Sequence, residues 1–182
     1  MSVPAFVLHA LLAAAAPARP AEGPPAREQA RRCEELSGEE GLAACRQAIA
    51  LGLAPPRLDA VRDLLARRLV SLERWAELVE HYREGVALHP DRAEAYYRLG
   101  CALLFAVDRP EEAIVPLREA ARLAPDDAPT RLALGIALSG LGREQETTAA
   151  FDEALRLDPG LLEGRPAAQA VLEAARKAEP WP

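Results

Sequence analysis

Three cysteines are the side chains of this 182-residue chain whose type and spacing could support covalent chemistry. Cys33 and Cys45 flank a Ser-Gly pair at residues 37–38, which we expect to form the turn between two antiparallel helices. Such packing could bring their Cα atoms within the roughly 4.4–6.8 Å that a disulfide requires. We therefore expect a disulfide between them, which an oxidising compartment would permit; two buried free thiols are the alternative. A zinc site is not expected, because two cysteines supply only half of a tetrahedral shell and no histidine lies near them in the sequence.

Cys101 and the histidines give weaker indications of chemistry. Cys101 has no expected partner, so it could be a reactive thiol or a mixed-disulfide site, while a passive, partly buried thiol is the simpler interpretation. His81 and His89 are eight residues apart on one expected helix, which does not match the spacing of helical metal ligands. The sequence contains no nucleophile elbow, phosphate loop or zinc-protease motif. These observations predict a protein without catalytic residues, metal or cofactor.

Alanine, leucine, arginine and glutamate dominate the composition, while aromatic residues make up only 4%. Because this composition favours helices over strands, we expect helices to position the cysteines and histidines. Residues 93–127 and 128–161 read as two copies of one segment, with a period of 34 to 35 residues. The positions that the copies share are Gly100 and Gly135, Ala120 and Ala154, and Pro125 and Pro159. A repeat of this length with two helical segments predicts a helical solenoid. Counting back one period from Pro125 reaches Pro90, so residues 56–90 form a third copy.

The chain before these copies divides at its prolines and glycines. Residues 19–26 contain three prolines and a glycine and are expected to be a linker, with structure beginning at Arg27. Residues 27–55 form a degenerate first helical hairpin. Ser37 stands three residues before Glu40, which predicts a capping box at the start of its second helix.

Residues 56–161 hold the three repeats, and residues 162–182 a capping helix and tail. Asp91 and Asp127 are predicted to cap the first helices of their repeats. The last helix should run from Pro166 to about residue 178, where it covers the apolar face that the final repeat would otherwise expose.

The N-terminal segment is typical of an export signal. Residues 1–18 carry no charged side chain, and residues 5–16 are apolar except for His9. This run is shorter than the roughly 20 residues that span a bilayer. Ala16 and Ala18 supply the small residues of a cleavage site, with cutting expected after Ala18. We therefore predict a signal peptide and a periplasmic or secreted protein; an uncleaved membrane anchor and an apolar tail of a cytosolic protein are the alternatives.

At the repeat positions the chain resembles the tetratricopeptide repeat family. In that family a small residue in the first helix lets the two helices of a hairpin cross closely, and Ala66, Gly100 and Gly135 hold this place. Small residues in the second helix face the next repeat; here they are Gly85, Ala120 and Ala154. The resemblance implies an all-α, right-handed α-solenoid of three to four antiparallel helical hairpins, followed by a C-terminal capping helix.

The resemblance also implies a non-catalytic module that binds a protein or peptide segment in a concave groove lined by the first helix of each hairpin. The groove residues that it implies are Arg67, Tyr97, Arg98, Cys101, Leu104, Phe105, Leu132 and Ile136. This mostly apolar lining would suit an apolar or amphipathic segment, with Arg67 and Arg98 as anchors for an acidic group. The alternative is that the apolar residues of this set pack against neighbouring helices.

The net charge of the chain argues against nucleic acid as a partner. The formal net charge is −6, with basic and acidic residues interspersed. Nucleic-acid binders instead gather basic side chains that neutralise phosphates, so no nucleic acid is expected, and no small-molecule substrate either. Membrane contact is expected only if the N-terminal segment is an uncleaved anchor. The two alternative functions are a cytosolic adaptor or co-chaperone and a thiol-based redox protein that uses Cys101.

Overall fold

The computed structural model describes residues 23–178, so the expected signal peptide at residues 1–18 lies outside the described residues. Every regular element within residues 23–178 is helical, as the composition predicts. The chain divides into two compact units, Met1–Leu72 and Glu73–Pro182, called unit 1 and unit 2. None of the helices in the described part combines the length and the apolar character that crossing a membrane requires.

Three helices of unit 1 lie within the described residues, and each buries apolar side chains. They are α1 (Pro24–Glu35), α2 (Gly38–Ala50) and α3 (Arg57–Ser71). α1 begins at Pro24, inside the expected linker of residues 19–26, so the linker prediction is wrong at its C-terminal end. The reason is that proline at the first helical positions already has a helical φ and lacks only an N–H group that the first turn leaves unpaired. Pro24 and Pro25, two of the three prolines that suggested a linker, therefore start the helix.

The predicted capping box of Ser37 and Glu40 does not form. The side chain of Ser37 makes no hydrogen bond to the start of α2. A capping box needs helical backbone geometry directly after the serine, but Gly38 has a φ of +59°, which turns the chain sharply between α1 and α2. The carbonyl oxygen of Ser37 instead accepts a hydrogen bond from the N–H group of Gly41 at 3.2 Å.

Arg68 ties α3 to the α1–α2 hairpin. Its Nη2 atom donates a hydrogen bond to the carbonyl oxygen of Cys33. The guanidinium passes directly over Gly41, where an added Cβ atom would lie 2.8 Å from the Cζ atom of Arg68. The absence of a side chain at residue 41 is therefore what gives Arg68 its path to α1.

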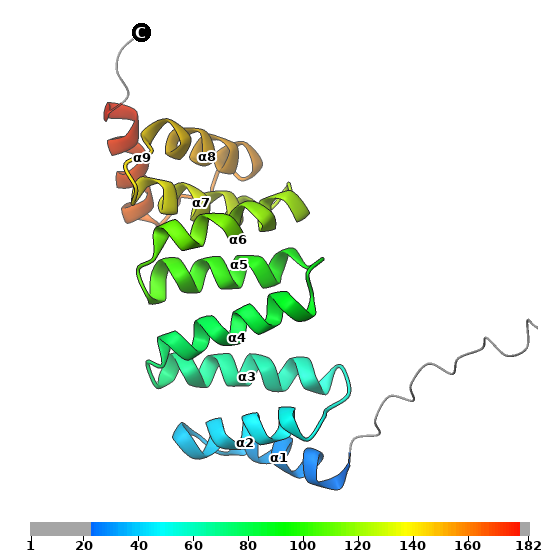
Figure 1. Cartoon of the computed structure of the whole chain (residues 1–182). Helices are drawn as coiled ribbons and strands as arrows, with labels where there is room; N and C mark the ends of the chain where they lie inside the picture. Colours follow the sequence, from blue (N-terminus) through cyan, green and yellow to red (C-terminus); the bar gives the residue numbers. More distant parts are fainter. Residues whose placement is uncertain (1–22, 179–182) are drawn as a thin grey trace, which may run out of the picture. The chain divides into compact units, whose positions relative to one another are not determined.

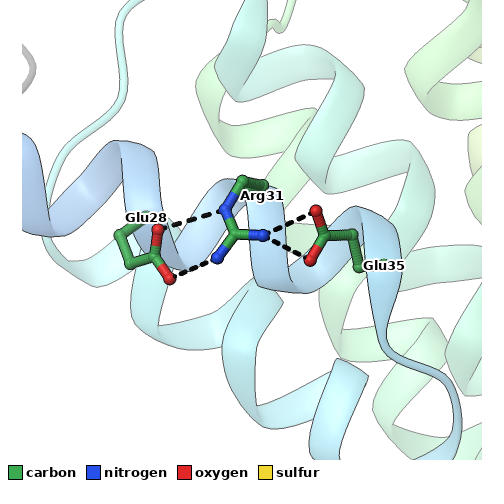
Figure 2. Close-up of polar contacts among 3 residues, drawn as sticks. All are labelled: Glu28, Arg31 and Glu35. Atoms are coloured by element: carbon green, nitrogen blue, oxygen red, sulfur yellow. Dashed lines mark hydrogen bonds and ion pairs between the residues drawn. The ribbon is translucent and has the colours of Figure 1, made fainter.

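The exposed face of α1 carries a short ion-pair network (Figure 2). Arg31 donates from Nη2 to Oε1 of Glu28 at 2.7 Å and from Nη1 to Oε1 of Glu35 at 2.6 Å. These hydrogen bonds raise the pKa of Arg31. Because all three side chains are exposed and lie on one helix, the network supports the helix itself and indicates no binding site.

Unit 2 carries the regular part of the repeat. Its helices within the described residues are α4 (Trp75–Leu88), α5 (Ala93–Cys101), the π-helix η1 (Ala102–Ala106), α6 (Pro110–Leu123), α7 (Ala128–Ser139), α8 (Glu144–Leu157) and α9 (Pro166–Ala178). α5 and α6 run antiparallel, as do α7 and α8, and these two pairs are the hairpins of the two similar sequence copies (Figure 1). Residues 56–90, the third predicted copy, are divided between the units, since α3 belongs to unit 1 and α4 to unit 2.

The predicted caps in unit 2 have different outcomes. Asp127 is the N-cap of α7 and accepts a hydrogen bond from the backbone N–H group of Thr130 at 3.0 Å, which confirms its predicted role. The prediction for Asp91 is wrong, because α5 begins at Ala93 and the residue at its N-cap is Arg92.

The small residues of the first helices do allow close helix crossing. A Cβ atom added to Gly100 would lie 2.5 Å from Cγ of Leu117, and one added to Gly135 would lie 2.5 Å from Cδ2 of Phe151. Real Cβ atoms essentially never approach this closely. Gly85 is different, because a Cβ atom there would have no neighbour within 4 Å. The small residue expected at position 85 is therefore not required by packing.

A π-helix absorbs the extra residue of the 35-residue copy. Residues 102–106 form η1 directly after α5, and the N–H group of Arg109 closes the segment by donating to the carbonyl oxygen of Leu103 at 2.8 Å. A π-helix accommodates one more residue per turn than an α-helix does. The turn that follows is conserved in form between the copies: Asp108 has a φ of 52° and Gly142 a φ of 65°.

The last helix covers the final hairpin, as predicted. Leu172 and Ala168 of α9 join Leu132 of α7 and Phe151 of α8 in one buried cluster. Leu161 and Leu162, in the connection before α9, complete it. α9 therefore closes the apolar end of the repeat array, as a solenoid requires.

Two buried threonines of this region should respond oppositely to replacement by valine, which has nearly the same shape. Thr147 is 0% exposed, and its Oγ1 atom has no hydrogen-bond partner among the described residues. Thr130 is equally buried, but its Oγ1 atom donates to the carboxylate of Asp127. We expect Thr147→Val to raise the free energy of unfolding by about 1 kcal/mol and Thr130→Val to lower it by about 1 kcal/mol. Urea denaturation midpoints measure both, and a shift of the same sign in the two variants would contradict this account.

Candidate functional site

The predicted groove residues of unit 2 lie on α5, η1 and α7. Tyr97, Cys101 and Phe105 stand at four-residue intervals along α5 and η1, and we call these three residues the α5 stripe. Phe105 is 62% exposed, while Tyr97 and Cys101 are partly exposed. An aromatic side chain with so much exposed surface at the end of a helix is available to contact a partner.

Tyr97 and Cys101 form a hydrogen-bonded pair within this stripe. Burial raises the pKa of the Cys101 thiol to about 11, although the hydrogen bond from Tyr97 acts in the opposite direction. Burial likewise raises the pKa of Tyr97. The carboxylates of Glu94 and Asp127 raise both pKa values further.

The raised pKa gives Cys101 little thiolate at neutral pH, so a fast reaction is not expected. We expect labelling of Cys101 by a thiol-exchange reagent at pH 8 to be roughly tenfold to 100-fold slower than that of a model thiol. The rate should rise with pH up to about 11, where the thiol titrates. Stopped-flow labelling of the oxidised protein measures this rate. A rate equal to that of the model thiol would support the alternative function, a redox protein that uses Cys101.

The two arginines expected to anchor an acidic group are placed differently from that expectation. Arg98 donates from Nε to Oε1 of Glu94 at 2.6 Å, so its charge is already paired on α5 itself. Arg67 belongs to unit 1, where its Nε atom approaches the carbonyl oxygen of Asp63 at 3.4 Å. The surface described here is formed by unit 2 alone.

Two of the apolar residues predicted for the groove, Leu104 and Leu132, lie instead in the packed interior. Leu104 is 9% exposed and Leu132 is 6% exposed, and Leu132 belongs to the buried cluster of α7, α8 and α9. Ile136 is partly buried and packs against that same cluster. Leu104 and Leu132 therefore follow the packing alternative, whereas Ile136 is partly exposed and stays a predicted groove residue.

Cys33 and Cys45 lie at bonding distance in unit 1. Their Sγ atoms are 2.04 Å apart and their Cα atoms 4.7 Å apart, across a sequence separation of 12 residues. Both side chains are fully buried between α1 and α2. Residues 23–178 hold no group of three or more histidine, cysteine or acidic side chains arranged to bind a metal ion.

Sequence reasoning did not single out the charged neighbours of the α5 stripe. The sequence predicts Asp127 only as the cap of its helix. The structure gives Asp127 two roles, because it caps α7 and also acts on Tyr97 and Cys101 of the preceding repeat. The repeat period could have suggested this, since consecutive first helices are neighbours in a solenoid.

Unit 2 has the arrangement of a helical repeat protein, in which antiparallel helix pairs follow one another and a final helix covers the last pair. At the level of sequence, no family model and no curated protein matches the chain. Solved structures do match it, and they are tetratricopeptide repeat proteins. The chain has the tetratricopeptide repeat fold.

Three of these structures illustrate the likeness. MamA from Desulfovibrio magneticus RS-1 matches with a TM-score of 0.63 and 22% identity over 86% of this chain and 96% of its own. The tetratricopeptide domain of Arabidopsis OM64 matches with a TM-score of 0.58 and 22% identity over 67% of this chain and 97% of its own. YrrB, described as a tetratricopeptide protein with an unusual peptide-binding site, matches with a TM-score of 0.61 and 19% identity over 82% of this chain and 71% of its own.

Proposed function

We propose that the protein is a non-catalytic interaction module that binds a peptide segment of a partner protein on the α5 stripe and the adjoining start of α7. The observation that carries the proposal is the exposure of Phe105 at the end of a stripe that also contains Tyr97 and Cys101. A preformed stripe on packed helices reduces the ordering cost that binding would otherwise impose. The likeness to YrrB, whose description names a peptide-binding site, supports this class of ligand.

The proposed location is the periplasm or the outside of the cell. Two features support it: the uncharged N-terminal segment of residues 1–18 and the bonding distance between Cys33 and Cys45. Disulfides persist chiefly in oxidising compartments. Intact mass measurement of the protein from its native source tests the location, because an N-terminus at Met1 or Ser2 would contradict export and favour the cytosolic adaptor.

Selection from a random peptide library displayed on phage tests the binding function. The full-length protein, oxidised and immobilised, should enrich peptides above a blank surface. Phe105→Ser and Tyr97→Ala should each weaken capture of these peptides about tenfold or more, as expected when a central aromatic contact is lost. Val115→Ser on α6 is the matched control, since Val115 is also strongly exposed, at 72%, but lies outside the α5 stripe.

Two results would count against the proposed function. One is the absence of any enriched peptide. The other is an equal loss of capture in Val115→Ser and Phe105→Ser, which would show that the peptides do not bind specifically on the α5 stripe. Circular dichroism of each variant shows whether its helices are intact, so that loss of binding is separated from loss of folding.

A further inference from the structure

We infer that unit 2 contains an ion-pair ladder that sets the distance between its second helices and loosens as the salt concentration rises. The second helices are α4, α6 and α8, each the second helix of its repeat. The ladder consists of three pairs that join different helices: Arg83 with Glu112, Arg118 with Glu146, and Arg176 with Asp152. The inference concerns the fold of unit 2 and does not depend on the proposed binding of a peptide.

Each second helix begins with the same pair of charged residues. An arginine is the N-cap, and a glutamate is the third residue of the helix. The arginines are Arg74, Arg109 and Arg143, and each donates to its glutamate, which is Glu77, Glu112 or Glu146. A pair three residues apart supports its own helix and does not by itself join two helices.

Two of these glutamates also bind an arginine of the preceding second helix. Glu112 accepts from Nη1 of Arg109 with its Oε1 atom at 3.2 Å and from Nη2 of Arg83 with its Oε2 atom at 3.0 Å. Glu146 repeats this arrangement on α8, where Oε1 accepts from the N-cap arginine and Oε2 accepts from Nη2 of Arg118 at 3.0 Å. In both copies one carboxylate oxygen therefore serves its own helix, and the other joins that helix to the preceding second helix.

The last step of the ladder has its charges reversed. Arg83 and Arg118 are the ninth residues of α4 and α6, and the ninth residue of α8 is Asp152. The helix beside α8 at this step is α9, from which Arg176 donates to the carboxylate of Asp152. The side chain at the ninth position thus changes sign where the neighbouring element changes, so each step still joins opposite charges. Pairs on one helix would not require this coordinated change.

The ladder acts between hairpins that are themselves closely packed. Gly100 lets α5 approach Leu117 of α6, and Gly135 lets α7 approach Phe151 of α8, so each hairpin should keep its own geometry. The ladder side chains are about half exposed, as for Arg118 at 52%. Salt screens charges in such positions. Because pairs that share a carboxylate form a network, their combined effect should exceed that of isolated surface pairs.

The distance between α6 and α8 tests the inference directly. Val115→Cys and Ala149→Cys place spin labels at equivalent exposed positions of these helices, in a Cys101→Ala background. Cys33 and Cys45 are fully buried and stay in place. Pulsed electron paramagnetic resonance then compares salt concentrations of about 0.01 M and 1 M, at which the Debye lengths are about 30 Å and 3 Å. We expect a shift to longer and more widely distributed distances at the higher concentration.

Two variants of α6 separate the ladder from a general effect of charge. Arg118→Gln should produce the longer distances at low salt, because it removes the step to α8. Arg122→Gln is the matched control, since Arg122 pairs with Glu119 of α6 itself, and it should leave the distances unchanged. Equal shifts in the two variants, or no shift from either Arg118→Gln or salt, would overturn the inference.

Exchanging the charges of the last step gives an independent test. Asp152→Arg places two arginines opposite each other and should speed hydrogen exchange in α9 about twofold to tenfold at low salt. Adding Arg176→Asp restores opposite charges and should slow the exchange again, even if the single variant detaches α9 completely. Unchanged exchange in the single variant, or exchange in the double variant that is no slower than in the single one, would show that the charges of this step do not hold α9.

Discussion

Replacing Gly135 by alanine should destabilise the protein by about 1–3 kcal/mol, although alanine is the better helix former. The new Cβ atom would lie 2.5 Å from Cδ2 of Phe151, whose ring is 0% exposed. α7 and α8 would have to separate, and the cluster that joins them to α9 would lose contacts. Urea denaturation followed by circular dichroism measures the loss.

Gly85→Ala is the matched control for this prediction. Gly85 also lies inside a helix, α4, but an added Cβ atom there meets nothing within 4 Å. This variant should therefore gain about 0.5–1 kcal/mol from helix propensity alone. If both alanine variants gained stability, close helix crossing would not be the reason for the glycine at residue 135.

A second change can show that the ring of Phe151 is the obstacle. In the Gly135→Ala background, Phe151→Leu should cost less than it does in the natural sequence, because it removes the atoms that the new methyl group strikes. A double-mutant cycle over these two residues measures the coupling. Strictly additive effects would indicate that the alanine acts elsewhere.

The repeat was predictable from the sequence because its signals are local and repeated. The closing prolines and the glycines at residues 100 and 135 recur at one period, and the structure confirms that the two glycines allow close helix crossing. The bounds of α9 agree with the predicted start at Pro166 and end near residue 178. Where a local signal could be met in two ways, prediction failed, as at Pro24, which can end a linker or begin a helix.

The π-helix could not be predicted, because two constraints on either side of it are tertiary. Gly100 is fixed against Leu117, and Asp108 is fixed in the left-handed conformation that precedes α6. One extra residue between these points could lengthen the turn or widen the helix. The sequence alone does not decide between the two, and in the structure the helix widens at residues 102–106.

The candidate site was predictable only in part for a related reason. The first helix of a hairpin in a solenoid contacts its partner helix and also its neighbours, so an apolar stripe with helical spacing does not show which face stays exposed. Tyr97 and Phe105 remain at least partly exposed, whereas Leu132 enters the cluster that α9 closes.

Reduction of a bond between Cys33 and Cys45 should lower the stability of unit 1 by about 3 kcal/mol, the value expected for closing so short a loop. The two cysteines are 12 residues apart and lie at bonding distance. Mass spectrometry should show a gain of about two daltons on reduction. Loss of this bond should lower the melting temperature by about 6–12 °C if the whole chain unfolds as one.

Burial of the two cysteines should limit the rate at which the disulfide is reduced. Both cysteines are fully buried, and the carbonyl oxygen of Cys33 is held by Arg68 of α3. A reductant can therefore reach the sulfur atoms only when unit 1 opens, so reduction should be slow in buffer and fast in moderate urea.

A double variant, Cys33→Ala with Cys45→Ala, should match the reduced protein in stability. Hydrogen exchange should then speed up in α1 and α2 but not in α8, because stability in a repeat array depends on neighbouring elements. An unchanged mass after reduction of protein from an oxidising compartment would show that packing alone holds the first hairpin.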